Sequence, residues 1–205
     1  MIWLEYLESI NTYFNIEILQ PNDSIIKTKI LNDNQVIIIL DGFIKILKVF
    51  TNGEVICTQL LQKDHIIKLK NSKNSFVNYY YTATAITKTV ILTTNITELK
   101  KKNIKIGKFS YYNFSKNNSM IQILCHKNTK KRIAQLLLIL SKEFGKIQKH
   151  NIIIPFYISH NTLSQIIGSQ RVNVTRIMNE LKEKRIINYN NQQVTIYNVL
   201  KLSQY

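Results

Sequence analysis

The sequence contains little glycine, proline, tryptophan and arginine, with five, two, one and four of these among its 205 residues. Isoleucine, asparagine, lysine and tyrosine are abundant instead. A+T-rich codons produce this usage, so it points to an A+T-rich genome such as that of an organelle. The length suits one large or two small domains, and 45% hydrophobic residues are enough to bury a core. We expect two domains.

Cysteine and histidine are too few and too scattered to predict a metal site. Cys57 and Cys125 have no neighbouring cysteines, so neither a zinc site nor an iron–sulfur cluster of cysteines can form within the chain. We interpret them as small buried side chains in a reducing compartment. No i, i+4 pair occurs among the four histidines, His65, His126, His150 and His160.

Long hydrophobic runs are also missing. No apolar run approaches the roughly 20 residues that a membrane span requires. Glu5 and Glu8 stand where a signal peptide carries positive charge. We therefore expect a soluble protein that works where it is synthesised and does not bind a membrane.

Acidic residues are few, 12 against 28 basic residues, which gives a formal net charge of +16. Such an excess favours a polyanionic partner such as nucleic acid. Codon bias toward lysine accounts for part of it, and a merely solvated basic surface is the alternative. The prediction therefore needs support from the positions of particular residues.

Residues 25–94 have the pattern of short strands separated by turns. "VIIIL" and "FIKILKVF" flank Asp41-Gly42, while "FIKILKVF" and "VICTQLL" flank Asn52-Gly53. Asp-Gly and Asn-Gly between β-rich runs are strong hairpin signals. "YYYTATAITKTVILTT" continues the pattern with β-branched and aromatic residues. We predict a small antiparallel β-domain with hairpins at both dipeptides.

Longer periodic segments follow. Residues 119–126, "SMIQILCH", predict a helix whose apolar residues either complete the core or pair with a second copy: Met120, Ile121, Ile123 and Leu124. Asn128 can cap a further helix that Gly145 ends. The apolar stripe of that helix is expected in the core: Ile133, Leu136, Leu137, Leu140 and Phe144.

The last third has the order of a winged helix-turn-helix. "NIIIPFYIS" predicts a strand, after which Ser159 can cap a helix through Ile167. Gly168-Ser169 makes a tight break, and Ser169 can cap a second helix to about Lys184. "IINYNNQQVTIYN" predicts two short β-runs about a polar turn. Helix, glycine-containing turn, helix and β-hairpin follow one another in that fold.

The second of these helices has two separate faces. At about 100° per residue from Arg171, the apolar residues fall between about 240° and 340°: Val174, Ile177, Met178 and Leu181. The other face spans 0° to about 140° and carries Arg171, Val172, Thr175 and Arg176. One face should pack on the first helix, and the other should be free to enter a DNA groove. An exposed valine there suits a thymine methyl group.

Three of the four arginines lie within or just after residues 167–181, although lysine carries most of the positive charge elsewhere. A guanidinium group binds O6 and N7 of guanine through two hydrogen bonds, which an ammonium does less selectively. The alternative is that Arg171 and Arg176 are ordinary exposed residues, paired with Glu180 and Glu183. We favour base reading because arginine is scarce in this chain.

These segments resemble the cAMP-receptor/fumarate-nitrate-regulator (Crp/Fnr) superfamily, most closely its nitrogen-control branch of cyanobacteria and red-algal plastids. "LSQIIGSQRVNVTRIMNELKEKRII" is similar to the family's helix-turn-helix, and "VTIYNVLKLSQ" to its terminal wing segment. "TKKRIAQLLLILSKEFG" resembles the helix that opens its DNA-binding domain, and "IIILDGFIKILKVFTNGEVICTQLL" resembles its β-roll. The likeness covers nearly the whole chain.

The resemblance implies an α+β fold of three parts. These are an antiparallel β-roll of the cyclic-nucleotide-binding kind (1–104), a dimerisation helix (105–126) and a winged helix-turn-helix (127–205). It implies a homodimer whose recognition helices, residues 169–184, read a palindrome in double-stranded DNA. RNA polymerase is a candidate further partner. With the composition, it implies an organelle-encoded protein of the plastid (chloroplast) stroma, the cytoplasm being the alternative.

The resemblance carries the base-reading role onto Arg171, Val172 and Arg176. The full DNA-binding set that we expect is Ser169, Gln170, Arg171, Val172, Thr175 and Arg176. The middle base-reading position is acidic in the cAMP-responsive branch. Val172 therefore points to the nitrogen-control branch, whose sites resemble GTA and TAC half-sites.

The sequence departs from the family at the effector pocket, for which the candidate set is Lys68, Leu69, Tyr79, Asn113 and Asn118. The cyclic-nucleotide branch needs a glycine–glutamate cradle where this chain has "HIIKLKNSKNSF". The nitrogen-control branch holds 2-oxoglutarate with arginines and a glutamate, and those positions are Tyr79, Asn113 and Asn118 here. We expect 2-oxoglutarate to bind more weakly than it does to a full cationic pocket.

The function that we predict is sequence-specific DNA binding by a transcription regulator, and two other classes compete with it. An enzyme of cupin-like β-fold would need clustered histidines and carboxylates, which "FIKILKVF" and its neighbours lack. We expect no catalytic residue. A non-specific basic nucleic-acid-binding protein would explain the lysines but not the two-faced helix.

Overall fold

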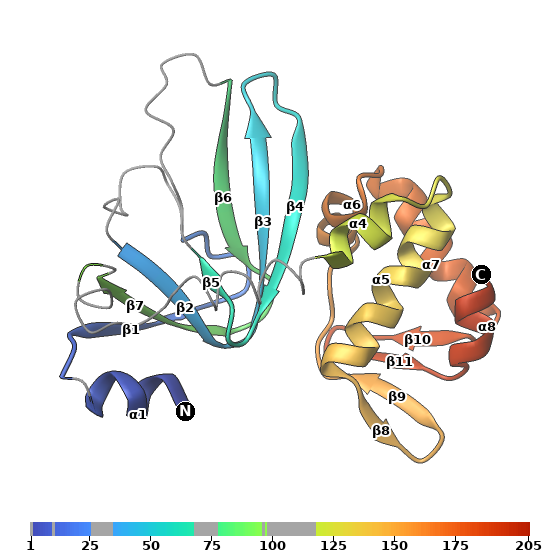
Figure 1. The fold of residues 1–205 in the computed structure, drawn as a ribbon. Coiled ribbons are helices and arrows are strands. Elements are labelled where there is room, and N and C mark those ends of the chain that lie inside the picture. Colours follow the sequence, from blue (N-terminus) through green and yellow to red (C-terminus); the bar gives the residue numbers. More distant parts are fainter. Residues whose placement is uncertain (1, 10, 26–34, 68–77, 96, 98–117) are drawn as a thin grey trace. The chain divides into compact units, whose positions relative to one another are not determined.

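The computed structural model describes residues 2–9, 11–25, 35–67, 78–95, 97 and 118–205. The chain divides into two compact units, residues 1–118 and 119–205. Figure 1 shows the elements of both units.

Two antiparallel sheets form most of the first unit (Figure 1). In one the strands follow the order β1 (Phe14–Leu19), β7 (Thr89–Asn95), β2 (Gln35–Asp41) and β5 (Ile66–Ile67). In the other the order is β4 (Val55–Gln62), β3 (Phe43–Phe50) and β6 (Tyr79–Ala85). A short helix, α1 (Ile2–Ser9), precedes them. The predicted antiparallel β-domain is confirmed.

Strand β2 is buried on both faces, which explains why "VIIIL" is a continuous apolar run. Alternate residues of β2 join a cluster to which both sheets contribute: Ile37, Ile39, Ile44, Ile46, Leu61, Ile67, Ala83 and Ile91. The remaining ones pack with α1 in a second cluster: Trp3, Leu7, Val36, Ile38 and Leu92. Each fully buried isoleucine contributes about 1.5–3 kcal/mol to the stability of the unit.

The prediction of a hairpin at Asp41-Gly42 is wrong. The flanking strands β2 and β3 belong to different sheets, so the dipeptide is a bend that carries the chain from one sheet to the other. Gly42 has a φ of +98°, and a Cβ there would lie 2.6 Å from the Thr89 Cα, so only glycine fits. The hairpin at Asn52-Gly53 is confirmed, because β3 and β4 pair across it and the Phe50 N–H donates to the Glu54 carbonyl at 2.8 Å.

The second unit contains five helices and four short strands among its described residues. The helices are α4 (Asn118–Leu124), α5 (Thr129–Phe144), α6 (His160–Ile167), α7 (Arg171–Glu183) and α8 (Val199–Gln204). The sheet has the order β10 (Ile187–Tyr189), β11 (Val194–Ile196), β9 (Asn151–Ile154) and β8 (Lys146–Gln148). Helices α6 and α7 followed by the β10–β11 hairpin make the predicted winged helix-turn-helix (Figure 1).

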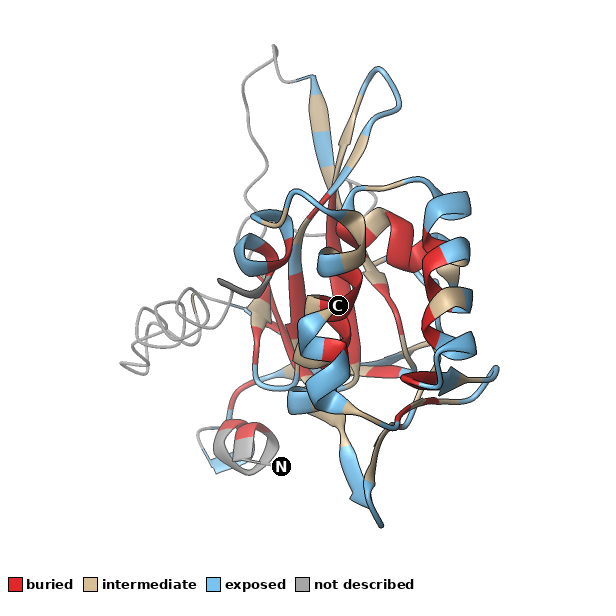
Figure 2. Cartoon of the chain, turned by 90° about the vertical axis from the view of Figure 1, so that its right-hand side faces the viewer, coloured by how far each residue is buried: buried red, intermediate tan, exposed pale blue. Residues whose placement is uncertain are grey.

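Local capping explains where most of these helices begin and end. The Asn128 side chain accepts from the Lys130 N–H at the start of α5, and Ser159 accepts from the Thr162 N–H at the start of α6. Gly168 ends α6 with a φ of 62°. The helices carry buried residues on one side and exposed residues on the other (Figure 2). The predicted stripe of α5 is buried from Ile133 to Leu140, whereas Phe144 at its end is half-buried.

Other predictions need correction. Ser169 does not cap α7, because the helix begins at Arg171 after Gln170, which makes no side-chain cap hydrogen bond. The strand predicted from "NIIIPFYIS" ends at Ile154, since β9 pairs on both sides and proline would remove a ladder hydrogen bond. Elements α1, β1, β8 and α8 were not predicted. Of the predicted helix 105–126, the part before Asn118 lies outside the described residues.

Candidate DNA-binding surface

Helix α7 has the two faces that its sequence predicts. Its buried residues are Val174, Ile177, Met178 and Leu181. Arg171, Val172 and Arg176 are exposed, and the valine side chain is 77% accessible. Thr175 is only half-buried, at the edge between the two faces. An apolar side chain this exposed on an otherwise polar helix face fits a surface that meets a partner.

The outer face of α7 forms a shallow hollow of about 510 Å³. Five residues line it: Arg171, Val172, Thr175, Arg176 and Asn179. The structure thus brings together four of the six predicted DNA-binding residues and adds Asn179. Of the other two, Ser169 donates its backbone N–H to the Ser164 carbonyl at 3.0 Å, and Gln170 is exposed directly before the helix.

The predicted alternative, in which these arginines pair with acidic residues of their own helix, is not what the structure shows. Glu180 instead binds Lys130 at 2.9 Å and Lys184 at 2.8 Å. The hydrogen bond from Lys184, with that from Lys130, lowers the pKa of Glu180 to about 2. Within the described residues, Arg171 and Arg176 have no ion pair, so their charges are available to a partner.

The remaining arginines lie elsewhere. Arg132 joins two segments of the second unit, because its Nε donates to the His126 carbonyl at 2.7 Å and its Nη1 to the Ile167 carbonyl at 3.0 Å. Arg185 is exposed beyond the end of α7, with a φ of 54°. Arg132 therefore has a structural role, and Arg185 lies outside the hollow.

A group of aromatic rings adjoins the polar side of α7, and sequence reasoning missed it. Tyr157 and Tyr189 stack with ring centroids 5.9 Å apart, and His160 meets Tyr189 edge-on at 5.5 Å. We call these three residues the aromatic buttress. Burial, and then the charge of Arg171, lowers the pKa of His160 below its ordinary value, which favours the neutral imidazole. No spacing rule signals the buttress, since its members come from separate elements.

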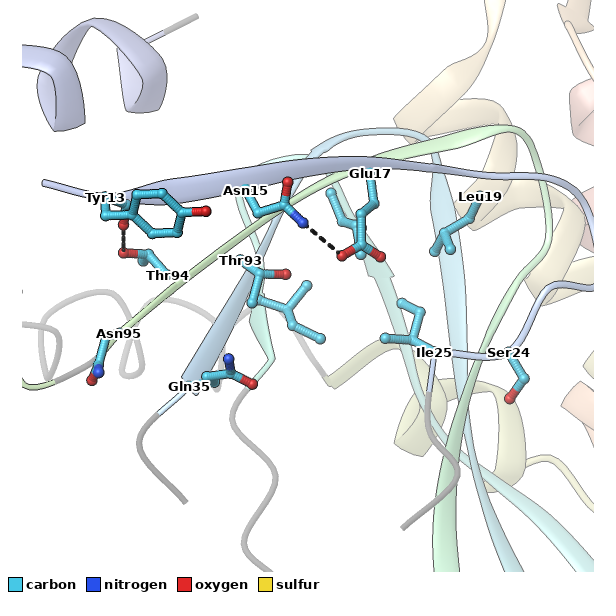
Figure 3. Close-up of a pocket in the computed structure, with 12 residues that line it drawn as sticks. Tyr13, Asn15, Glu17, Leu19, Ser24, Ile25, Gln35, Thr93, Thr94 and Asn95 are labelled. Carbon is cyan, nitrogen blue, oxygen red and sulfur yellow. Dashed lines mark hydrogen bonds between the residues drawn. The ribbon is translucent and has the colours of Figure 1, made fainter. Parts of the chain in front are cut away.

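The first unit has its own hollow, of about 710 Å³, beside β1, β2 and β7 (Figure 3). Leu19, Ile25, Ile37 and Ile91 line its apolar part, and most of its other lining residues carry amide or hydroxyl groups. Among the described residues that line it, Glu17 is the one charged residue, and it accepts from the Asn15 side-chain nitrogen at 3.0 Å. These described residues therefore offer no positive charge to a dicarboxylate.

Of the predicted effector residues, Tyr79 is the one whose side chain the structure describes, and it does not line this hollow. Lys68, Leu69 and Asn113 lie outside the described residues, and of Asn118 only the backbone is described. Tyr79 lies on β6, where its ring is 5.9 Å from that of Phe50 and 5.5 Å from that of Tyr81. The Lys48 Nζ lies 3.7 Å from the Tyr79 ring centroid, which is a cation–π contact.

No group of three or more histidine, cysteine, aspartate or glutamate side chains in the described part of the chain could hold a metal ion. No helix there is long and apolar enough to cross a membrane.

Comparison with known proteins gives consistent results. The Crp-like helix-turn-helix domain family matches residues 131–205. The chain is 30% identical to a protein of Porphyra purpurea named as an HTH-type transcriptional regulator, ycf28, over 98% of this chain and 86% of that protein. It is 28% identical to the global nitrogen regulator of Nostoc sp., over 83% of this chain and 80% of that protein.

Solved structures agree on the fold. A Thermus thermophilus transcriptional regulator of the CRP family superposes with a TM-score of 0.75 at 15% identity, covering 92% of this chain and 95% of that one. FixK2 from Bradyrhizobium japonicum superposes with a TM-score of 0.72 at 14% identity, covering 94% and 96%. From its fold, its winged helix-turn-helix and its sequence relatives, the chain belongs to the Crp/Fnr family of transcription regulators.

Proposed function

We propose that this regulator is of the nitrogen-control type and binds a palindromic DNA site as a homodimer, with α7 in the major groove. The observation that carries the proposal is the outer face of α7, where two exposed arginines without ion pairs in the described structure flank an exposed valine. The name of the Nostoc relative supports the nitrogen-control type, and that of the Porphyra relative supports a helix-turn-helix transcription regulator.

Three residues of the hollow have a proposed role in reading bases. Arg171 and Arg176 are separated by about 7.5 Å along the helix axis, at about 1.5 Å per residue, or about two base-pair steps of roughly 3.4 Å. They would therefore bind guanines at different positions through two hydrogen bonds each. Val172 between them would contact a thymine methyl group.

The residues before α7 would bind the DNA backbone. Gln170 makes no side-chain cap hydrogen bond, so the first N–H groups of α7 are not satisfied by its side chain. Such N–H groups and the helix dipole favour a phosphate at a helix N-terminus. Ser169 and Gln170 would thus position the helix, while the arginines discriminate between bases.

The dimer would form through the helix that ends at Leu124. In α4, Met120 and Ile123 are buried, but Ile121 is 62% and Leu124 is 36% exposed. An isolated winged helix reads too few base pairs to be selective, whereas two copies read two half-sites. We propose that the side chains of Ile121 and Leu124 belong to the dimer interface. RNA polymerase is a further proposed partner, to which we assign no residues.

The effector response would be weak. A dicarboxylate that enters a partly buried site needs its charges paired, and arginine does this with directed hydrogen bonds. Tyr79 offers a hydroxyl group, and the cation that accompanies it is Lys48, already over its ring. We propose that DNA binding depends little on 2-oxoglutarate. We also propose a plastid location, because the residue usage is that of an A+T-rich genome and because a relative is found in Porphyra.

A titration of the full chain with two labelled duplexes tests the proposal. One carries a GTA/TAC palindrome, and the other has the same bases scrambled. We expect Arg171→Ala and Arg176→Ala each to weaken binding to the palindrome by about 1–3 kcal/mol, with a much smaller effect on the scrambled duplex. Arg185→Ala removes the same charge outside the hollow and is the control. Equal losses on both duplexes would support a non-specific basic protein instead.

A further inference from the structure

Two uncharged polar side chains on the outer face of α7 are each held by a residue from another element. Thr175 Oγ1 lies 3.0 Å from Nδ1 of His160, the first residue of α6. Asn179 Oδ1 accepts a hydrogen bond of 2.7 Å from the hydroxyl of Tyr189 on β10. Both side chains line the hollow.

The two hydrogen bonds depend on the same packing. His160 and Tyr189 contact each other edge-on, and Tyr157 stacks on Tyr189. The Lys182 Nζ lies 5.1 Å from the Tyr189 ring centroid. Lys182 is one helical turn after Asn179 on α7. Rings packed in this way lose little further freedom when they form a hydrogen bond, so the side chains that they hold are pre-oriented.

The bond to Tyr189 determines which group Asn179 can offer. The tyrosine hydroxyl occupies one of the two lone pairs of the amide oxygen and fixes the orientation of the amide, and no described residue accepts from the amide nitrogen. The usual asparagine contact with adenine uses both amide atoms, one on N6 and one on N7. Asn179 held by Tyr189 is therefore poorly suited to that contact and well suited to donate to a single acceptor.

The bond to His160 has a corresponding effect on Thr175. The His160 Nε2 is buried and has no hydrogen-bond partner within the described structure. A hydrogen on that atom would be an orphaned buried N–H, which is rare in proteins, so the tautomer with hydrogen on Nδ1 is favoured. Nδ1–H then donates to Thr175, whose own hydroxyl hydrogen is left to donate outward.

We propose that the aromatic buttress makes the outer face of α7 a surface of hydrogen-bond donors. His160 and Tyr189 are positioning residues, and Thr175 and Asn179 donate to acceptors on DNA, such as guanine N7 and O6, adenine N7 or thymine O4. With the guanidinium groups of Arg171 and Arg176, each polar side chain that lines the hollow then presents a donor to the DNA. This inference rests on the proposed DNA-binding function and adds a set of specificity residues to it.

Selection of duplexes from a library randomised over the half-site tests the inference with the full chain. Tyr189→Phe keeps the stacked ring and removes only the hydroxyl group, which frees the Asn179 oxygen. We expect this variant to gain adenine at one base pair of the half-site, with a change in relative affinity of about two- to tenfold for one hydrogen bond. Tyr197→Phe, at an exposed tyrosine outside the buttress, should select the wild-type bases.

Double variants separate positioning from simple structural support. In an Asn179→Ala background, Tyr189→Phe should have no further effect on base preference. Similarly, His160→Asn retains a donor near the Nδ1 position and should keep the wild-type base preference. His160→Leu should lose the same part of the base preference that Thr175→Val loses. Circular dichroism spectra of all variants establish that they are folded.

The outcomes distinguish this inference from the function on which it rests. A wild-type chain that selects no bases would overturn both. A selective wild type with a Tyr189→Phe variant that selects the same bases would overturn the inference alone. So would a Tyr189→Phe effect that persists unchanged in the Asn179→Ala background, since the hydroxyl would then act through another route.

Discussion

Replacing Arg171 and Arg176 by lysine separates the charge of the α7 surface from its geometry. Both arginines are exposed, and in the described structure neither forms an ion pair. Substitutions at such surface positions usually change the free energy of unfolding by less than about 0.5 kcal/mol. A change in DNA affinity would therefore report on the contact with DNA and not on the stability of the second unit.

The expected magnitude follows from the contact that is lost. A bidentate pair discriminates against the wrong base by about 1–3 kcal/mol, which is about 5- to 150-fold in Kd. Lysine keeps the attraction to phosphate, so affinity for scrambled DNA should change by less than about twofold. The two positions are expected to contact separate base pairs, so the losses of Arg171→Lys and Arg176→Lys should add approximately.

Fluorescence anisotropy with labelled duplexes at several salt concentrations measures both quantities. The slope of log K against log salt should be the same for wild type and the lysine variants, because the number of cations at the DNA is unchanged. Preference for the palindrome should fall. Arg185→Lys, outside the hollow, should match wild type in both. If the α7 lysine variants kept the full preference, arginine geometry would not be what reads the bases.

Three further predictions concern other parts of the chain. The double variant Ile121→Glu, Leu124→Glu should be monomeric in analytical ultracentrifugation, because dimerisation would bury two carboxylates of each chain at the interface. An intact dimer would show that α4 is not part of the interface. Glu180 has a folded pKa of about 2, below its ordinary value of 4.5. Its stabilising contribution should be complete above pH 4.5 and lost as the pH falls toward 2, and thermal unfolding of Glu180→Gln should show a flatter acid dependence. Calorimetry should find weak binding of 2-oxoglutarate, and the metabolite should raise DNA affinity little. Low-micromolar binding with a large gain in DNA affinity would show instead that the protein senses 2-oxoglutarate.

Much of the second unit could be predicted from sequence because several local signals agree there. Asn128 and Ser159 cap helices at the positions where apolar periodicity begins, and Gly168 supplies the left-handed residue that separates α6 from α7. The two faces of α7 follow from the helical period alone. Local signals that agree in this way leave few competing structures.

The first unit shows where local signals are insufficient. Asp41-Gly42 provides a positive φ, but a bend between two sheets needs this as much as a hairpin does. Which strands pair is decided by residues far away in the sequence, and here β2 pairs with β7 and β5. "FNIEIL" of β1 does alternate and could have been predicted as a strand, although Ile16 and Ile18 remain largely exposed.

The candidate site shows the same division. The residues on the outer face of α7 could be predicted, because they share one helix. The contacts of His160 with Thr175 and of Tyr189 with Asn179 could not, because each joins residues of two different elements. Such contacts depend on how α6 and the wing pack on α7, which the helical period does not specify.

The distribution of arginine and lysine in the second unit supports a DNA-facing role for α7. Where a compact charge suffices, lysine is present, as in the pairing of Lys130 and Lys184 with Glu180. Arg132 instead binds two carbonyl groups from separate segments, which its extended guanidinium group reaches at once. Arg171 and Arg176 have the same directed donors but no acceptors of this kind among the described residues. Both guanidinium groups are therefore available to a partner, and paired acceptors such as guanine O6 and N7 match their geometry.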